Sequence, residues 1–143
     1  MPGIIVGIDG SGHSQQALEW AVKHAAIEHV PLTVLSVHEV ATNAWTGSPI
    51  IMAEDRPEEE KTRQAAQEAV NKTISELGAQ PGPVTVRVIS GQPARALIDA
   101  SEGADMVVVG SRGVGGFSSL RMGSVSSKVV HHAACPVVVV RHR

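Results

Sequence analysis

Length, composition and charge place this sequence among globular proteins of one domain. Its 143 residues are 43% hydrophobic and 18% charged, which allows a sizeable core and excludes a disordered chain. The formal net charge is −2, and the aromatic residues are two tryptophans and one phenylalanine, which argues against nucleic acid and the membrane surface as partners. We expect residues 1–143 to form a single domain without an internal boundary.

The sequence predicts a cytoplasmic location. No apolar run approaches the roughly 18 residues that a membrane span requires, and the N-terminal residues lack the basic stretch and cleavage site of a signal peptide. The single cysteine, Cys135, excludes an internal disulfide and suits a reducing compartment. Because its neighbours are alanine and proline, we interpret Cys135 as a small core residue and not as a reactive thiol.

Strands and helices alternate from the N-terminal residues onward. Residues 3–8 are nearly continuous in isoleucine and valine, which predicts a buried strand that ends in the turn residues 9–12. Ser14 is the expected N-cap of a helix over residues 14–29, and a second strand is predicted over residues 32–37.

An irregular segment and a long helix follow. Residues 38–56 show no regular spacing of hydrophobic residues, and we interpret them as an irregular segment between two regular elements. Pro57 is expected to open the helix and Gly78 to end it. The apolar residues at helical spacing that we expect to form its buried stripe are Ala65, Ala66, Ala69, Val70 and Ile74.

The last third of the sequence completes the alternation. Alternating valines predict a half-covered or edge strand over residues 84–89, followed by a helix over residues 93–101 and a buried strand over residues 106–109. A helix is predicted over residues 124–133 and a strand of four valines over residues 137–140. Crossovers of this length demand parallel strands with helices on both faces, so the fold class is α/β.

A glycine-rich loop before the last predicted helix is the strongest functional signal. Its motif, Gly110-x2-Gly113-x9-Gly123-Ser124, is neither a Walker loop nor the Gly-x-Gly-x-x-Gly of dinucleotide enzymes. Unpaired amides and the dipole of a helix that begins at Ser124 form a natural anion site. In a doubly wound sheet, this loop meets the other strand ends at the edge where ligands bind. We therefore predict a site for the phosphates of a nucleotide.

Four motifs together resemble the universal stress protein family, in its single-domain type. They are Val6-Gly7-Ile8-Asp9-Gly10-Ser11, Val108-Val109-Gly110-Ser111-Arg112-Gly113, Gly123-Ser124-Val125-Ser126 and Cys135-Pro136-Val137-Val138-Val139-Val140. The resemblance implies a doubly wound five-stranded parallel sheet in the order 3-2-1-4-5, an adenine nucleotide alpha hydrolase-like fold. It also implies a homodimer through the strand of residues 137–140. The apolar character of that strand separately favours pairing with a second subunit.

The resemblance implies ATP as the ligand, because family members with the intact glycine motif typically bind it. Ile8 and Asp9 would line the ribose and adenine, and Val37 would touch the adenine. The residues expected around the ribose and phosphates are Val109, Gly110, Gly113, Gly123, Ser124, Val125 and Ser126, the last four through N–H and hydroxyl groups. Arg112 is a candidate phosphate contact, with a solvated side chain as the alternative. Asp9 is a candidate for holding Mg²⁺ or Mn²⁺ through water, with capping of its own turn as the alternative.

Efficient catalysis is not expected from this sequence. The site loops show no nucleophile–base pair, no paired carboxylates and no lysine placed to clamp phosphates. The sequence therefore predicts an ATP-binding protein of regulation or stress response. Three alternatives stay open: a cyclic AMP-binding protein that uses the same cleft, a weak ATP hydrolase, and a dimeric interaction module with an empty cleft.

Overall fold

The computed structural model describes residues 3–9, 12–39, 45–46, 55–79, 81–111 and 123–141. Within these residues, strands and helices alternate as predicted. In chain order they are β1 (Ile4–Ile8), α1 (Gly12–Glu28), β2 (Leu32–Glu39), α2 (Asp55–Leu77), β3 (Val84–Gly91), α3 (Pro93–Ser101), β4 (Met106–Gly110), α4 (Ser124–His132) and β5 (Val137–Val140). In the described part of the chain, no helix has the length and apolar character needed to cross a membrane.

The sheet has the order β3-β2-β1-β4-β5, which the family resemblance implies, and every neighbouring pair is parallel, as the alternation of strands and helices predicts. Ile4 of β1 lies opposite Leu32 of β2 on one side and opposite Met106 of β4 on the other. The first three strands therefore lie side by side in chain order, and the chain then crosses to the other side of β1, where it forms β4 and β5. This reversal of strand order between β1 and β4 is the position at which open α/β sheets bind ligands.

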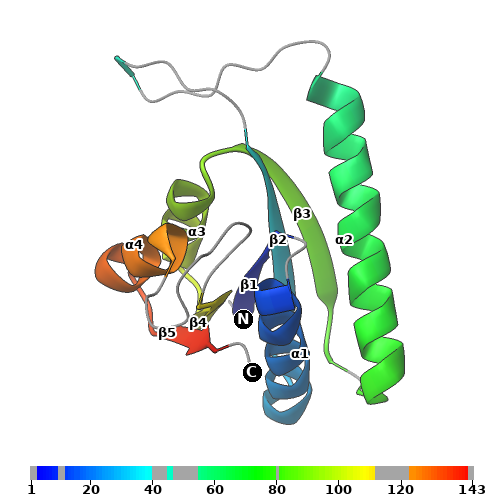
Figure 1. Ribbon diagram of the computed structural model, residues 1–143. Coiled ribbons are helices and arrows are strands. Elements are labelled where there is room, and N and C mark those ends of the chain that lie inside the picture. Colours follow the sequence, from blue (N-terminus) through cyan, green and yellow to red (C-terminus); the bar gives the residue numbers. More distant parts are fainter. Residues whose placement is uncertain are drawn as a thin grey trace.

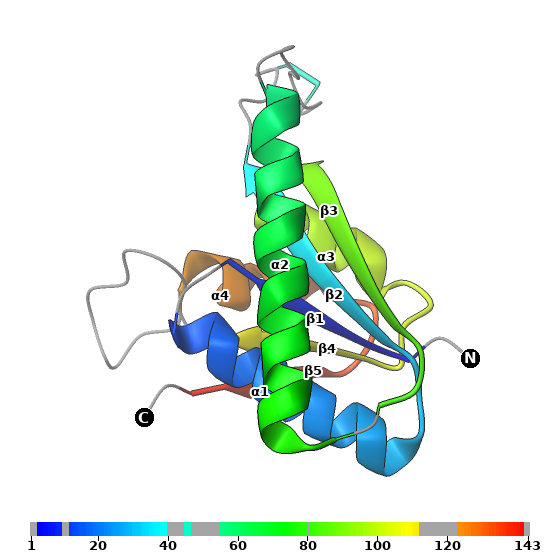
Figure 2. The same ribbon diagram turned by 90° about the vertical axis from the view of Figure 1, so that its right-hand side faces the viewer.

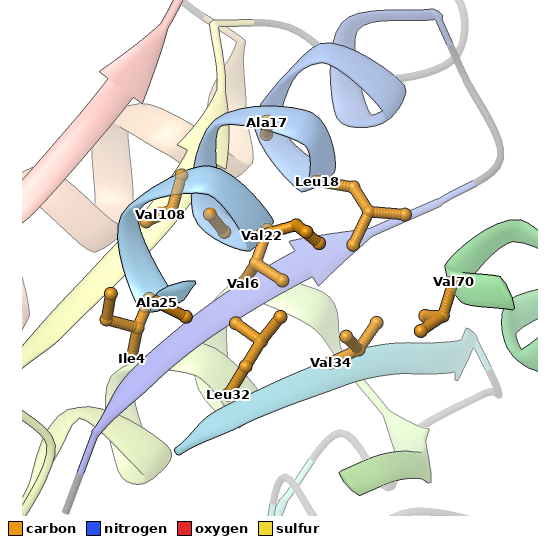
Figure 3. Packing of buried hydrophobic residues seen from close by; sticks show 11 residues of the cluster. Ile4, Val6, Ala17, Leu18, Val22, Ala25, Leu32, Val34, Val70 and Val108 are labelled. Atoms are coloured by element: carbon orange, nitrogen blue, oxygen red, sulfur yellow. The ribbon is translucent and has the colours of Figure 1, made fainter. Parts of the chain in front are cut away.

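α1 and α2 cover one face of the sheet, and α3 and α4 cover the other (Figure 1). In Figure 2, α2 stands in front of the strands, whereas α3 and α4 lie behind them. The face under α1 and α2 is packed by the buried stripe of α1 and by alternate residues of the central strands, shown in Figure 3. The opposite face packs Leu97 of α3 and Val129 of α4 against Ile5, Val107 and Val109. Because successive strand residues point to opposite faces, β1 and β4 must be apolar throughout.

The two edges of the sheet differ in character. In β3 the valines at positions 84, 86 and 88 are partly buried while Thr85 and Arg87 are exposed, which confirms the predicted edge strand. The valines of β5, at the other edge, are all half-buried. Two further predictions are confirmed at helix ends: α3 begins at Pro93, and Gly78 ends α2 with a positive φ of 62° while its N–H donates to Ile74 at 3.0 Å.

Two helix predictions are wrong. α1 begins at Gly12, so Ser14 lies inside its first turn and not at its cap. Ser14 is buried, and its hydroxyl accepts the N–H of Asp9 at 3.2 Å, which links the end of β1 to the first turn of α1. In α2, Ala65 is exposed and Thr73 is buried at 1% exposure. The helix is tied to α1 at that point, because the Thr73 hydroxyl accepts Gln15 Nε2 at 2.9 Å.

Several element boundaries also differ from the predictions. β2 and β3 run further than expected, because His38 and Glu39 pair with Ser90 and Gly91. The hydrophobic pattern of one strand could not reveal this extension, because the backbone hydrogen-bond partners come from the neighbouring strand. α2 begins at Asp55, ahead of Pro57. Most of the predicted irregular segment, residues 40–44 and 47–54, lies outside the described residues.

Candidate functional site

The predicted site residues of β1, β2 and β4 meet at the carboxyl edge of the sheet. Ile8 lies opposite Ser36, next to Val37, and Val6 lies opposite Val108, so the ends of β1, β2 and β4 are neighbours. The switch point between β1 and β4 falls at this edge. The structure therefore brings together the five predicted residues Ile8, Asp9, Val37, Val109 and Gly110. Arg112 and Gly113 lie outside the described residues.

The apolar residues at this edge face different sides of the sheet. Val37 and Val109 pack on the α3–α4 side, and Val109 is 4% exposed. Ile8 packs on the α1–α2 side. A ligand on the α3–α4 side therefore meets the side chain of Val37 but only the backbone of Ile8.

Asp9 follows β1 and is exposed. Its backbone N–H donates to the Ser14 hydroxyl, so α1 holds the Asp9 backbone in place. In the described residues, no group of three His, Cys, Asp or Glu side chains could hold a metal ion. A divalent cation at Asp9 would therefore need additional oxygen ligands, and the phosphates of a bound nucleotide fit that requirement.

Position 110 requires a glycine, because the backbone of a helix approaches it closely. A Cβ atom at this position would lie 2.7 Å from the carbonyl oxygen of His13 and 2.8 Å from its carbonyl carbon. The first turn of α1 therefore packs directly against the end of β4. Sequence pattern attributed this glycine to a nearby ligand, whereas the neighbour that the structure shows is the α1 backbone.

Ser111, the residue after β4, is hydrogen-bonded to three residues, one in β5 and two at the start of α4. Its N–H donates to the carbonyl of Val140 in β5 at 2.9 Å. Its carbonyl accepts the N–H of Gly123 at 2.7 Å and lies 2.9 Å from the hydroxyl oxygen of Ser126. These bonds bring the N-terminus of α4 to the exit of β4. Sequence reasoning missed Ser111, because its partners are distant in sequence and its own side chain gives no signal.

The N-terminus of α4 has free backbone donors at this edge. Its N-cap is Gly123, which supplies no side-chain cap, and the first helical hydrogen bond runs from the N–H of Ser127 to the carbonyl of Gly123 at 3.0 Å. The amides of residues 124–126 precede that bond, and they lie at the positive end of the helix dipole. Ser124 is exposed and Ser126 is 2% exposed. This arrangement suits an anion such as phosphate.

A second helix begins at the same edge. The N-cap of α3 is Gln92, which makes no side-chain cap hydrogen bond, and Pro93 occupies the first turn. α3 and α4 lie on the same face of the sheet. Each begins beside the carboxyl end of the strand that precedes it, so the positive ends of both dipoles point toward the carboxyl edge. By contrast, His131 and His132 lie at the opposite end of α4, exposed and with ring centroids 6.4 Å apart.

Fold and site together define an α/β protein of the doubly wound type, in which a helix without a side-chain N-cap begins beside the switch point. The model of the Universal stress protein family matches residues 2–141, and the chain belongs to that family. A universal stress protein of Mycolicibacterium smegmatis is 37% identical over 139 residues, which cover 96% of this chain and 47% of that protein. The chain thus spans about half the length of the curated relatives it matches.

Solved structures show the same fold. The universal stress protein UspA from Lactobacillus plantarum has a TM-score of 0.75 at 23% identity, with 98% of each chain covered. A universal stress protein in complex with cAMP has a TM-score of 0.67 at 24% identity, covering 96% of this chain and 94% of that one. A universal stress protein from Archaeoglobus fulgidus in complex with dAMP has a TM-score of 0.65 at 23% identity, covering 97% of each chain.

Proposed function

We propose that this chain is an ATP-binding protein of regulation or stress response, without efficient catalysis. The observation that supports this proposal best is the uncapped N-terminus of α4, held by Ser111 at the end of β4 beside the switch point. Free amides and a helix dipole at that position favour phosphate. The nucleotides named for two proteins of the same fold, cAMP and dAMP, are adenine nucleotides.

Each predicted residue has a place in this proposal. Ile8, Asp9 and Val37 would adjoin the adenine and ribose at the ends of β1 and β2. Val109 and Gly110 would adjoin the ribose, with Arg112 and Gly113 as candidates from outside the described residues. Ser124, Val125 and Ser126 would offer backbone amides to the phosphates. Gly123 would adjoin the phosphates without donating to them, because its own N–H is bound to the Ser111 carbonyl. Asp9 would hold Mg²⁺ or Mn²⁺ through water, together with phosphate oxygens.

The experiment that tests the proposal starts from the purified protein. Nucleotide retained through purification is identified by mass spectrometry, and nucleotide-free protein is then titrated with ATP, AMP and adenosine by calorimetry. We expect ATP to bind more tightly than adenosine, because adenosine lacks the groups that the α4 amides would bind. Equal affinity for ATP and adenosine, or no binding of either, would contradict the proposed phosphate site.

Cyclic AMP is the second candidate ligand. It is favoured by the solved structure of a universal stress protein in complex with cAMP, which shares this fold. A competition titration separates the two ligands, since a site that uses the triphosphate should retain ATP against an excess of cyclic AMP. Displacement of ATP by an equal concentration of cyclic AMP would favour the second candidate. Turnover of ATP above background with Mg²⁺ or Mn²⁺ would establish the weak hydrolase.

We further propose a homodimer formed through β5. The four half-buried valines at this sheet edge support it, since a free edge strand is seldom so apolar. A cytoplasmic location stays a prediction from the cysteine content.

A further inference from the structure

We infer that Ser126 is a positioning residue, whose hydroxyl ties the exit of β4 to the start of α4 instead of contacting the ligand. The role in ligand binding rests on the proposed function; the tie itself is tested in nucleotide-free protein. Sequence similarity alone suggests that the hydroxyls of Ser124 and Ser126 both face the phosphates. The environments of the two side chains separate their roles.

The Ser126 hydroxyl is enclosed by the protein. The residue is 2% exposed, and its Oγ lies 2.9 Å from the carbonyl oxygen of Ser111 and 3.1 Å from that of Gly123. A hydroxyl carries one proton, and both nearby atoms are acceptors. That proton is therefore directed at the backbone and is unavailable to a phosphate oxygen.

Ser124 has the opposite environment. It is the first residue of α4 and is exposed. Residues two apart in a helix differ by about 200° in direction, so the side chains of the two serines point to opposite sides. Of these two, Ser124 is the serine whose hydroxyl an external anion can reach.

The carbonyl of Ser111 is the anchor of this arrangement. It accepts the N–H of Gly123 at 2.7 Å in addition to the hydroxyl of Ser126, while the N–H of Ser111 is bound to Val140. The residue that precedes segment 112–122 and the residue that follows it are thus directly bonded. Ser126 adds a second bond across the same junction. The position of the α4 amides relative to the end of β4 then depends on these two bonds.

Removing the hydroxyl should loosen this junction. In Ser126→Ala the Ser111 carbonyl keeps the Gly123 amide as a donor but loses its second bond. The Gly123 amide should exchange with solvent roughly three to ten times faster, the factor expected for one hydrogen bond. ATP affinity should fall by a similar factor, roughly three- to tenfold, while adenosine affinity stays unchanged.

The test measures amide hydrogen exchange by NMR in nucleotide-free protein, and then titrates ATP and adenosine. The variants are Ser126→Ala, Ser126→Thr, which keeps a hydroxyl, and Ser127→Ala as the matched control on the next residue. The Val6 amide, in the centre of the sheet, reports whether each variant keeps the fold. We expect faster Gly123 exchange in Ser126→Ala only.

Two results would overturn the inference. The first is unchanged Gly123 exchange in Ser126→Ala, whatever happens to ATP affinity, because a hydroxyl that serves only as a ligand contact leaves the nucleotide-free protein unaltered. The second is faster Gly123 exchange in Ser127→Ala to the same extent. Failure of the proposed function can be distinguished from failure of this inference. In the first case wild-type protein would bind no ATP, and the exchange measurement would still decide the role of the Ser126 hydroxyl.

Discussion

Gly110 shows how a single residue can belong to the site and to the core at once. Its glycine-rich context in the sequence correctly marked the end of β4 and the start of the loop. The sequence could not reveal that the backbone of His13, in another element, occupies the space where a side chain would lie. Loss of ligand binding in a Gly110 variant could therefore come from a lost ligand contact or from a less stable fold, and the two causes must be measured separately.

We predict that Gly110→Ala lowers the free energy of unfolding by about 1–3 kcal/mol, the range for overpacking in a rigid environment. Gly7→Ala is the matched comparison. Its added Cβ would meet the flexible end of Leu97 at 2.9 Å, whereas the contact at Gly110 is backbone. Urea denaturation of both variants checks this prediction. Equal loss of stability would show that α1 can shift away from β4.

Cys135 provides a second prediction for a single residue. It is half-buried and packs on the α3–α4 side, so the expectation of a small core residue holds only in part. Burial raises the pKa of the Cys135 thiol, the hydrogen bond from the Val107 backbone opposes this, and the charge of Asp105 adds to it. We expect slower alkylation by iodoacetamide in the folded than in the unfolded protein near neutral pH.

The sign of the pH effect follows from the raised pKa. The folded state keeps the thiol protonated at pH values where the unfolded chain has begun to lose the proton, so stability declines as pH rises through that window. Alkylation rates measured against pH should show their midpoint at higher pH in the folded protein. A folded-state midpoint below that of the unfolded chain would contradict the assignment.

At the scale of elements, the start of α4 offers a substitution that removes an amide without breaking the helix. Proline is favoured at the first helical position, and the preceding Gly123 has φ −67° and ψ 163°, which a residue before proline can adopt. Ser124→Pro should therefore keep α4 intact while deleting one donor. Ser124→Ala is the control that deletes only the hydroxyl.

We expect ATP affinity to be lower in Ser124→Pro than in Ser124→Ala by roughly tenfold or more, the factor for a hydrogen bond to a charged group. Calorimetry measures the affinity, and circular dichroism verifies the helix content. Equal affinities in the two variants would mean that the Ser124 amide does not contact the phosphates.

The sequence predicted where helices and strands occur more accurately than which side of each helix is buried. Runs such as residues 106–109 are apolar enough to be recognised alone, since both faces of β4 are buried. The buried side of α2 depends on where α1 and the sheet touch it, and so Ala65 was wrongly placed inside and Thr73 was missed. The hydroxyl of Thr73 is compatible with burial only because Ala69 and Gln15 are its partners.

For the whole molecule, the testable property is assembly through β5. The carbonyls of Pro136 and Val140 accept the N–H groups of Val107 and of Ser111, the residue after β4. The backbone groups of the alternate residues, Val137 and Val139, therefore point away from β4. Val139→Pro removes one outward N–H and leaves the β4 ladder untouched, and proline is tolerated on edge strands in that orientation. Val139→Ala controls for the lost side chain.

We expect Val139→Pro to be monomeric at concentrations where wild type and Val139→Ala are dimeric, because pairing of two edge strands uses these outward groups. Sedimentation velocity checks the prediction. Wild-type protein that stays monomeric at micromolar concentration, or a dimeric proline variant, would remove β5 as the interface.

The central position of β1 also affects how the protein is made. β1 leaves the ribosome well before one of its two neighbours, β4, because three helices and two strands lie between them in the chain. Until then, one side of a very apolar strand lacks its partner, and such edges are prone to aggregation. The sheet therefore cannot be completed around β1 until β4 has been synthesised, and slow synthesis of the residues between the two strands should increase the demand for chaperones.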